Sequence, residues 1–243
     1  MCGVASALVL LHGFTQTRQS WRRTVAALDG RYTRTVVPDL PGHGQMGERR
    51  PASLAATLAY LAALVDEPHV LAGYSMGGRV ALHAALARPR LVERLILVGA
   101  SPGLATEPER AERRAADEAL ADRIEAVGAE AFAREWAAQP LFAGQPPAVA
   151  AAAHEDRLRR SGVEHAAQLR GLGTGAMPSL WERVGELRMP VTLIVGKQDT
   201  KFLAIAERMQ ACLSPAAVVV VPGVGHAVHL EAPAAVAAHL AVP

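Results

Sequence analysis

A serine flanked by glycines is the residue of this chain best placed to do chemistry. Gly73-Tyr74-Ser75-Met76-Gly77 has the pattern G-x-S-x-G, between an apolar run that predicts a strand and a run that predicts a helix. Such a turn holds the serine hydroxyl above the end of a sheet, and a Cβ at either glycine would crowd its neighbours. The N–H of Met76, at the start of the helix, is expected to donate to a developing oxyanion.

A carboxylate and a histidine follow this serine in chain order. Asp199 comes directly after an apolar run, whereas the earlier candidate position, Gly99-Ala100-Ser101, holds no carboxylate. We expect Asp199 to orient a histidine base, with capping of the next helix as its alternative role. His226 follows Gly225 on a glycine-rich loop and is expected to be that base.

Three other histidines have roles to consider. His229 competes with His226 for the role of base; its alternative is a loop histidine bonded to a backbone group. His12 ends the first expected strand, and the N–H of Phe14, two residues later, is expected to be the second oxyanion donor. His43 is expected to be a turn residue.

Alternating strands and helices must position these residues. The expected strands are short apolar runs: Ala7–Leu11, Arg34–Val37, His69–Gly73, Val92–Val98, Val191–Val195 and Ala217–Val221. The expected helices lie between and after them: Ser20–Leu28, Ser53–Val65, Gly77–Ala87, Thr200–Leu213 and Pro233–Leu240. This order predicts an α/β fold whose parallel strands are buried on both faces, with ligands beyond their carboxyl ends.

The alternation breaks between residues 106 and 185. This segment is helical, rich in alanine and arginine, and too long for a loop in a compact domain. It predicts a helical cap over the strand ends, with residues 1–105 and 186–243 forming the core. Only Met1–Ser6 precede the first expected strand, which predicts a sheet of about six strands.

Bulk composition bounds the function. The chain has 243 residues, 51% of them hydrophobic, and a net charge of +2, which argues against a nucleic-acid binder. Cys2 and Cys212 form no disulfide framework, and no metal-ligand cluster or long apolar segment occurs. These features predict a soluble cytoplasmic protein, without a bound metal or stable membrane insertion, that is a monomer or a small homo-oligomer.

In chain order, these motifs resemble the α/β-hydrolase superfamily. The matching motifs are Leu11-His12-Gly13-Phe14, Asp39-Leu40-Pro41-Gly42-His43-Gly44, Gly73-Tyr74-Ser75-Met76-Gly77-Gly78, Gly196-Lys197-Gln198-Asp199 and Gly225-His226. Further segments resemble one lyase family, the 2-succinyl-6-hydroxy-2,4-cyclohexadiene-1-carboxylate synthases of menaquinone biosynthesis. They are Ser101-Pro102-Gly103-Leu104, Glu109–Arg114, Trp136–Phe142, Leu169–Gly175 and Asp199-Thr200-Lys201-Phe202.

The narrower resemblance implies an elimination that needs no cofactor. Pyruvate would leave 2-succinyl-5-enolpyruvyl-6-hydroxy-3-cyclohexene-1-carboxylate, with Ser75, activated by His226 and Asp199, as the base. The enolate oxygen would lie between the N–H groups of Phe14 and Met76. The alternative is a carboxylesterase or other acyl hydrolase that uses the same triad as its nucleophile system. A non-catalytic binding module of this fold would be expected to lack one member of the triad.

The substrate of that family carries three carboxylates, and the resemblance places their ligands on Arg79, Arg113 and Arg157. From the residues alone, Arg79 lies one helical turn after Ser75 in apolar surroundings and should face the same opening. Arg157 belongs to a run that also offers Arg159 and Arg160, and a solvent-facing run is the competing interpretation.

The remaining contacts are expected from the cap and the serine turn. Arg113 continues a stripe that should face inward, while Arg114 should face solvent. The stripe consists of Ala116, Leu120, Ile124 and Val127. Trp136 is expected to line the pocket, with packing inside the cap as its alternative, and Tyr74 to border the site.

Overall fold

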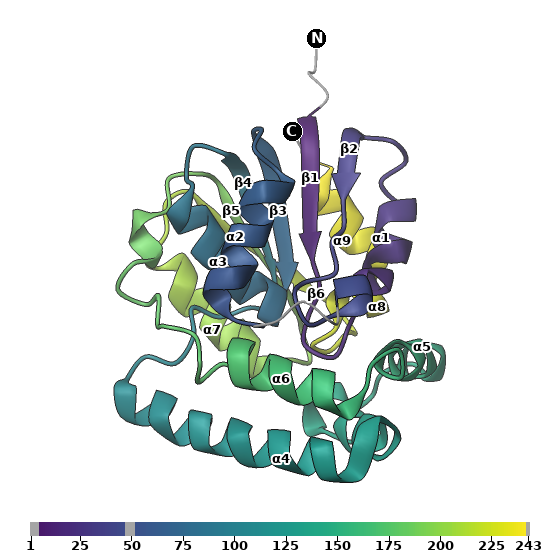
Figure 1. The fold of residues 1–243 in the computed structure, drawn as a ribbon. Coiled ribbons are helices and arrows are strands. Elements are labelled where there is room, and N and C mark those ends of the chain that lie inside the picture. The colour runs from purple at the N-terminus through teal and green to yellow at the C-terminus, as the bar shows by residue number, and fades with distance from the viewer. Residues whose placement is uncertain (1–4, 47–51, 242–243) are drawn as a thin grey trace.

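The computed structural model describes residues 5–46 and 52–241 and contains a six-stranded parallel sheet with helices on both faces (Figure 1). The strands are β1 (Ala5–Leu11), β2 (Tyr32–Val36), β3 (His69–Tyr74), β4 (Val92–Val98), β5 (Val191–Gly196) and β6 (Ala216–Val221). They lie in the order β2-β1-β3-β4-β5-β6, and every neighbouring pair is parallel. The predicted α/β fold and six-stranded sheet are therefore confirmed.

The two faces of the sheet form two cores. Val9 and Leu11 of β1 pack with the helices α2 (Leu54–Leu64) and α3 (Met76–Ala87), whereas Leu8 and Leu10 pack on the opposite face. Burial on both faces was expected for all strands, but it is wrong for β2 and β6, which are partly exposed. Both are edge strands with one neighbour, so only the four central strands are covered on both sides.

Helices of the core connect these strands. They are η1 (Arg18–Trp21), α1 (Arg22–Ala26), η2 (Gly44–Met46), α2 (Leu54–Leu64), α3 (Met76–Ala87), η4 (Val184–Glu186), α7 (Thr200–Gln210), α8 (Val228–Glu231) and α9 (Pro233–Leu240). The expected helix Ser20–Leu28 is instead a 3-10 turn followed by the short α1, and α8 was not expected. The predicted start of α2 is correct, because Ser53 caps it by accepting from Ala56 N–H.

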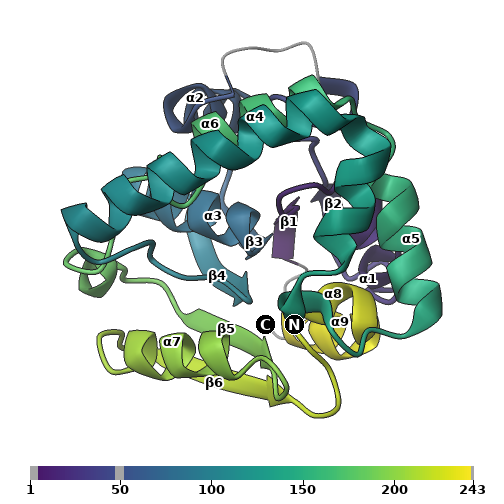
Figure 2. The same cartoon turned by 90° about the horizontal axis from the view of Figure 1, so that it is seen from below.

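The segment between β4 and β5 is a helical insertion that lies across the carboxyl ends of the strands (Figure 1). It contains α4 (Glu107–Ala137), η3 (Pro140–Phe142), α5 (Pro147–Arg157) and α6 (Gly162–Leu172). Figure 2 views these helices from the cap side, with the ends of β1, β3 and β4 behind them. We refer to this insertion as the cap.

The helices of the cap have a capping box, a bend and an ion network. Thr106 and Glu109 form a capping box that starts α4, and Gly128 bends this helix at a φ of 77°. On the outer surface, Arg170 of α6 reaches three carboxylates of α4 at 2.6–2.7 Å. Those carboxylates belong to Glu118, Asp122 and Glu125.

No helix in the described residues is long and apolar enough to cross a membrane. Within the same residues, no group of three or more potential ligands could hold a metal ion. Cys212 is free and exposed, whereas Cys2 lies outside the described residues.

Candidate active site

Ser75 lies in a strained turn between β3 and α3. Its φ of 49° and ψ of −109° are rare for a residue with a side chain, and Ser75 N–H donates to Val98 O at 2.9 Å. A Cβ on Gly73 would lie 2.4 Å from Gly77 O, and one on Gly77 would lie 2.4 Å from Leu11 O. The turn therefore requires glycine at both positions, and it lifts the hydroxyl toward the cap.

Asp199 and His226 reach this serine from two other strand ends. His226 Nδ1–H donates to Asp199 Oδ2 at 2.6 Å, and Ser75 Oγ lies 3.3 Å from His226 Nε2. Asp199 and His226 are both buried. The other oxygen of Asp199 accepts from Phe202 N–H at 3.2 Å. Asp199 thus also caps α7, so both roles considered for it are compatible.

The two expected oxyanion donors belong to the turn at Ser75 and to the loop after the neighbouring strand β1. Met76 is the first residue of α3, and Phe14 follows β1, whose Leu11 pairs with Gly73 of β3. Neither N–H donates to an acceptor within the part of the chain that the structure describes. Both remain open for a ligand atom, although their role is a prediction.

His229 does not contact Ser75. It was considered as a competing base or as a loop histidine bonded to the backbone, but it lies on α8 and its Nε2 lies 3.2 Å from Gln16 Oε1. His12 accepts from Leu40 N–H at 3.1 Å, and His43 Nδ1 lies 3.4 Å from Pro41 O. His226 is therefore the histidine that the fold brings to the serine.

Arg79 is buried one turn along α3 from Ser75. Arg79 Nη2 donates to Leu172 O at 3.4 Å, whereas its Nε is buried and meets no acceptor among the described residues. Burial, and then the nearby charge of Arg113, lower the pKa of Arg79 to about 10, against the opposing effect of Asp117. The guanidinium remains charged at neutral pH but lacks a carboxylate within ion-pair distance in the described chain.

Arg113 points to the same region but already has a partner. Its Nε donates to Asp117 Oδ1 at 2.7 Å, and 42% of its side chain is exposed. Ala116 was expected in the inward stripe and is exposed, because Asp117 takes the inward position. Asp117 stands four residues after Arg113, a spacing from which the pair could have been predicted.

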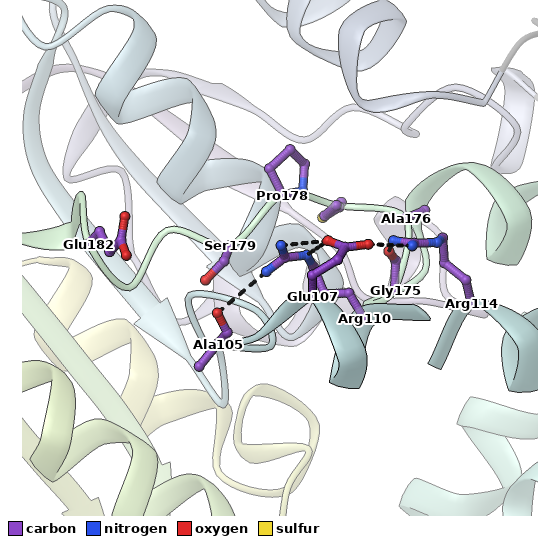
Figure 3. Close-up of a pocket in the computed structure, with 10 residues that line it drawn as sticks. Ala105, Glu107, Arg110, Arg114, Gly175, Ala176, Pro178, Ser179 and Glu182 are labelled. Atoms are coloured by element: carbon purple, nitrogen blue, oxygen red, sulfur yellow. Dashed lines mark hydrogen bonds and ion pairs between the residues drawn. The ribbon is translucent and has the colours of Figure 1, made fainter. Parts of the chain in front are cut away.

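Arg114 faces a different space. It donates to Gly175 O and to Glu107, and Arg110 pairs with the same glutamate (Figure 3). These side chains line a cavity of about 420 Å³ at the start of α4. Because its lining excludes Ser75, this cavity is separate from the candidate site. Arg113 and Arg114 therefore diverge, as expected.

Arg157 is the member of its run that turns toward the site. Its Nε donates to Thr15 Oγ1 at 3.3 Å, and its Nη1 is buried without an acceptor in the described residues. The guanidinium carbon lies 5.6 Å from the centroid of the Phe142 ring, which is 6.5 Å from the His226 ring. The expectation of a solvent-facing run is wrong here, because α5 presents Arg157 to the core.

The two neighbouring arginines have their own partners. Arg159 is exposed and lies 3.6 Å from Asp156. Arg160 is buried and donates from Nη1 to Gly42 O at 2.8 Å and to Glu164 at 3.3 Å. The Nε and Nη2 of Arg160 are also buried without an acceptor in the described residues, but Arg160, unlike Arg157, has a carboxylate partner in Glu164.

Aromatic side chains enclose the histidine. The Tyr74 and Phe202 rings lie 5.2 and 4.5 Å from the His226 ring. Burial raises the pKa of Tyr74, so its hydroxyl stays protonated. Trp136 is half-buried and packs edge-on against Phe14 at 5.2 Å, which combines cap packing with proximity to the expected oxyanion loop.

Polar contacts near the site also involve three residues that no sequence motif indicated: Gln16, Thr17 and Asp156. Gln16 contacts Gly13 and His229, and Thr17 donates to Asp156 from both its N–H and its hydroxyl. Each contact joins the loop after β1 to another residue, and two of these partners, His229 and Asp156, are far away in the sequence. No local pattern of residue types predicts such pairs.

Comparison with known proteins agrees with this architecture. The sequence profile described as "Alpha/beta hydrolase family" matches residues 8–239, and the chain belongs to this family.

Within the family, the similarity is narrower. A Bacillus subtilis (strain 168) protein named "Putative 2-succinyl-6-hydroxy-2,4-cyclohexadiene-1-carboxylate synthase" is 39% identical, over 94% of this chain and 86% of its own length. A Klebsiella pneumoniae protein named "2-succinyl-6-hydroxy-2,4-cyclohexadiene-1-carboxylate synthase" is 34% identical, over 96% of this chain and 92% of its own length. The solved structure "Structure of MenH from S. aureus" matches with a TM-score of 0.90 and 31% identity, over 97% and 91%. The resemblance inferred from the sequence is thus confirmed.

A structure of an esterase is also similar. The thermophilic esterase from Thermogutta terrifontis, solved with malate bound, matches with a TM-score of 0.80 and 27% identity. It covers 98% of this chain and 89% of its own. The fold therefore accommodates more than one reaction, and the site must distinguish them.

Proposed function

We propose that this chain is a carbon–oxygen lyase of menaquinone biosynthesis. It would eliminate pyruvate from 2-succinyl-5-enolpyruvyl-6-hydroxy-3-cyclohexene-1-carboxylate to give 2-succinyl-6-hydroxy-2,4-cyclohexadiene-1-carboxylate. The names of its relatives support this reaction. The observation that carries the proposal is a pair of buried guanidiniums, Arg79 and Arg157, that have nitrogens without an acceptor and, unlike the buried Arg160, no carboxylate within ion-pair distance in the described chain. Such charges are unfavourable unless a ligand supplies carboxylates.

Ser75 is the proposed base. His226 takes the hydroxyl proton, and the serine oxygen removes the proton from the ring carbon next to the succinyl ketone. Asp199 accepts from His226 Nδ1–H, which leaves Nε2 free to accept and stabilises the imidazolium that forms. The electron pair then moves through the ring alkene and breaks the carbon–oxygen bond to the enolpyruvyl group. That group takes up a proton and leaves as pyruvate.

The N–H groups of Phe14 and Met76 are the proposed oxyanion donors. The ketone oxygen gains negative charge as the proton leaves; Met76 directly follows Ser75, and Phe14 follows the strand that pairs with β3. A donor of this kind accounts for about 3–4 kcal/mol of transition-state stabilisation in acyl-transfer enzymes. The same donors would serve an enolate, so a covalent acyl-enzyme is not required.

Three arginines are the proposed carboxylate ligands. Arg79 and Arg157 offer buried nitrogens, and Arg113 adds its charge while Asp117 holds its Nε. Bidentate pairing suits guanidinium and carboxylate. Tyr74 and Trp136 would border the substrate. A neutral ester gives no comparable use for two buried cations, which favours the lyase over the acyl hydrolase.

Pyruvate release tests the proposal. The purified chain is given the enolpyruvyl substrate, and pyruvate is followed through lactate dehydrogenase. Wild type should release pyruvate, and Ser75→Ala should lose at least about 10³-fold in kcat. Ser179→Ala, in the separate cavity, is the matched control and should retain activity. Turnover of p-nitrophenyl esters without pyruvate release would instead identify an acyl hydrolase.

A further inference from the structure

Gln16 holds Gly13, the residue directly before Phe14, through both its side chain and its main chain. Its side-chain Oε1 accepts from Gly13 N–H at 3.2 Å, and its own backbone N–H donates to Gly13 O at 3.2 Å. The Gly13 carbonyl and the Phe14 N–H belong to one planar peptide and point in opposite directions. His12 Nδ1 also lies 2.9 Å from Gly13 O, so His12 and the main chain of Gln16 fix the direction of the Phe14 N–H. The side chain of Gln16 fixes the preceding peptide through Gly13 N–H, so both peptide planes that meet at Gly13 are held.

His229 forms a hydrogen bond with the side chain of Gln16. Its Nε2 lies 3.2 Å from Gln16 Oε1, and because an amide oxygen only accepts, the histidine must donate. Burial, and then the nearby His226, lower the pKa of His229 to about 3, so the ring is neutral at physiological pH. The ring also packs between Trp21 and Tyr74, with centroids 4.8 and 4.1 Å away. The donor is thus held rigidly.

The loop needs this support because its backbone is strained. Thr15 has a φ of 66°, which is unfavourable for a β-branched residue. Gly13 lies so close to the Tyr74 ring that a Cβ on it would be 2.6 Å from Cδ1. Side-chain bonds from Gln16 hold a conformation that the backbone alone disfavours.

We propose that Gln16, held by His229, is a positioning residue that aims the Phe14 N–H at the oxyanion formed beside Ser75. The inference rests on the proposed function only in taking Phe14 as a donor, and it holds for an enolate and for a tetrahedral intermediate. Gln16 acts through Phe14 and does not touch the substrate. Its loss should therefore lower kcat and leave KM almost unchanged.

Three variants test this role. Gln16→Met keeps the side-chain length and removes the acceptor, and should lower kcat about 10- to 100-fold with KM within about 2-fold. Gln16→Glu restores an acceptor and should stay within about 3-fold of wild-type kcat. Gln19→Met is the matched control, since Gln19 is an exposed glutamine on the adjacent turn, and it should match wild type.

A second measurement does not depend on turnover. Amide hydrogen exchange of Gly13, followed by NMR, should be at least about 10-fold faster in Gln16→Met than in wild type. Unchanged exchange, or a raised KM with unchanged kcat, would overturn the proposal. If the chain turns over esters and not the enolpyruvyl substrate, the same kcat comparison is made with the ester. Failure of the lyase assignment is thereby separated from failure of the positioning role.

Discussion

The outer surface of the cap and the interface between cap and core use arginine in opposite ways. On the outer surface, Arg170 has three carboxylate partners from α4 within 2.7 Å. At the cap–core interface, Arg79 and Arg157 are buried, and neither has a carboxylate within ion-pair distance in the described residues. The outer surface has three acids around one arginine, whereas the interface contains two cations without acids alongside the paired Arg113 and Arg160.

Under the proposed function, this difference separates arginines that stabilise the fold from arginines that would bind a ligand. Arg170 joins two helices, and its charges are satisfied in the isolated protein. A buried guanidinium without a carboxylate destabilises the isolated protein, so its presence points to a partner that arrives from solution. A substrate with several carboxylates would supply that partner.

The sharpest way to break this comparison is to remove one arginine from each region. Arg79→Met should lower kcat/KM for the enolpyruvyl substrate about 30- to 160-fold, because a charge-assisted hydrogen bond contributes ~2–3 kcal/mol. Arg170→Met should stay within about 3-fold of wild type, because it lies on the outer surface. Pyruvate release measures both. Equal losses would show that the two regions do not differ in function.

Acid should destabilise the cap–core interface. Burial lowers the pKa of His165 to about 4, although its bond to Arg157 O opposes this effect. The unfolded chain, with a histidine pKa near 6.5, takes up this proton first. Stability is therefore complete above about pH 6.5 and falls by up to ~1.4 kcal/mol per pH unit toward pH 4.

His165→Gln isolates that contribution. The amide keeps a donor for Arg157 O and does not titrate, so urea melts between pH 7 and 5 should show a shallower loss of stability than in wild type. Identical slopes for the two proteins would mean that His165 is not neutral in the folded state.

In the absence of ligand, Arg79→Met should not destabilise the protein. Removing an unpaired buried charge is expected to leave Tm unchanged or raise it by about 1–3 °C. Calorimetry of the ligand-free variant measures this. A large fall in Tm would mean that Arg79 has structural partners in the folded chain, contrary to the comparison.

The smallest effect is expected on the outer surface. Arg170→Met should lower Tm by at most about 3 °C, because partly exposed ion pairs contribute little. The difference from wild type should shrink in high salt, where exposed charges are screened. A salt-independent difference would indicate that packing of the Arg170 stem, rather than its charge, joins α4 to α6.

The fold and the order of Ser75, Asp199 and His226 could be predicted from the sequence. Short apolar runs define buried strands within two residues, and a glycine-flanked serine defines its turn. The partial exposure of β2 and β6 could not be predicted, because a short strand sequence such as the valine run of β6 has the same pattern at the edge of a sheet as in its centre. The order of the strands in the sheet decides which strands lie at its edges.

The contacts made by the cap were harder to predict. The first part of the α4 stripe was assigned one residue out of phase, at Ala116 instead of Asp117, since several helical phases fit an alanine-rich helix, whereas Ile124 is buried as predicted. Arg157 could not be separated from its neighbours because its direction depends on how α5 meets the core. The bond between Gln16 and His229 joins residues 213 positions apart. Only the folded chain brings such residues together.

The central claim is that Arg79 and Arg157 await the carboxylates of a ligand. A crystal structure of Ser75→Ala with the enolpyruvyl substrate tests it most directly, because the variant binds without turnover. The account predicts a substrate carboxylate oxygen within about 3 Å of Arg79 Nε and another near Arg157 Nη1. A bound substrate whose carboxylates lie elsewhere, with both guanidiniums still lacking an acceptor, would contradict it.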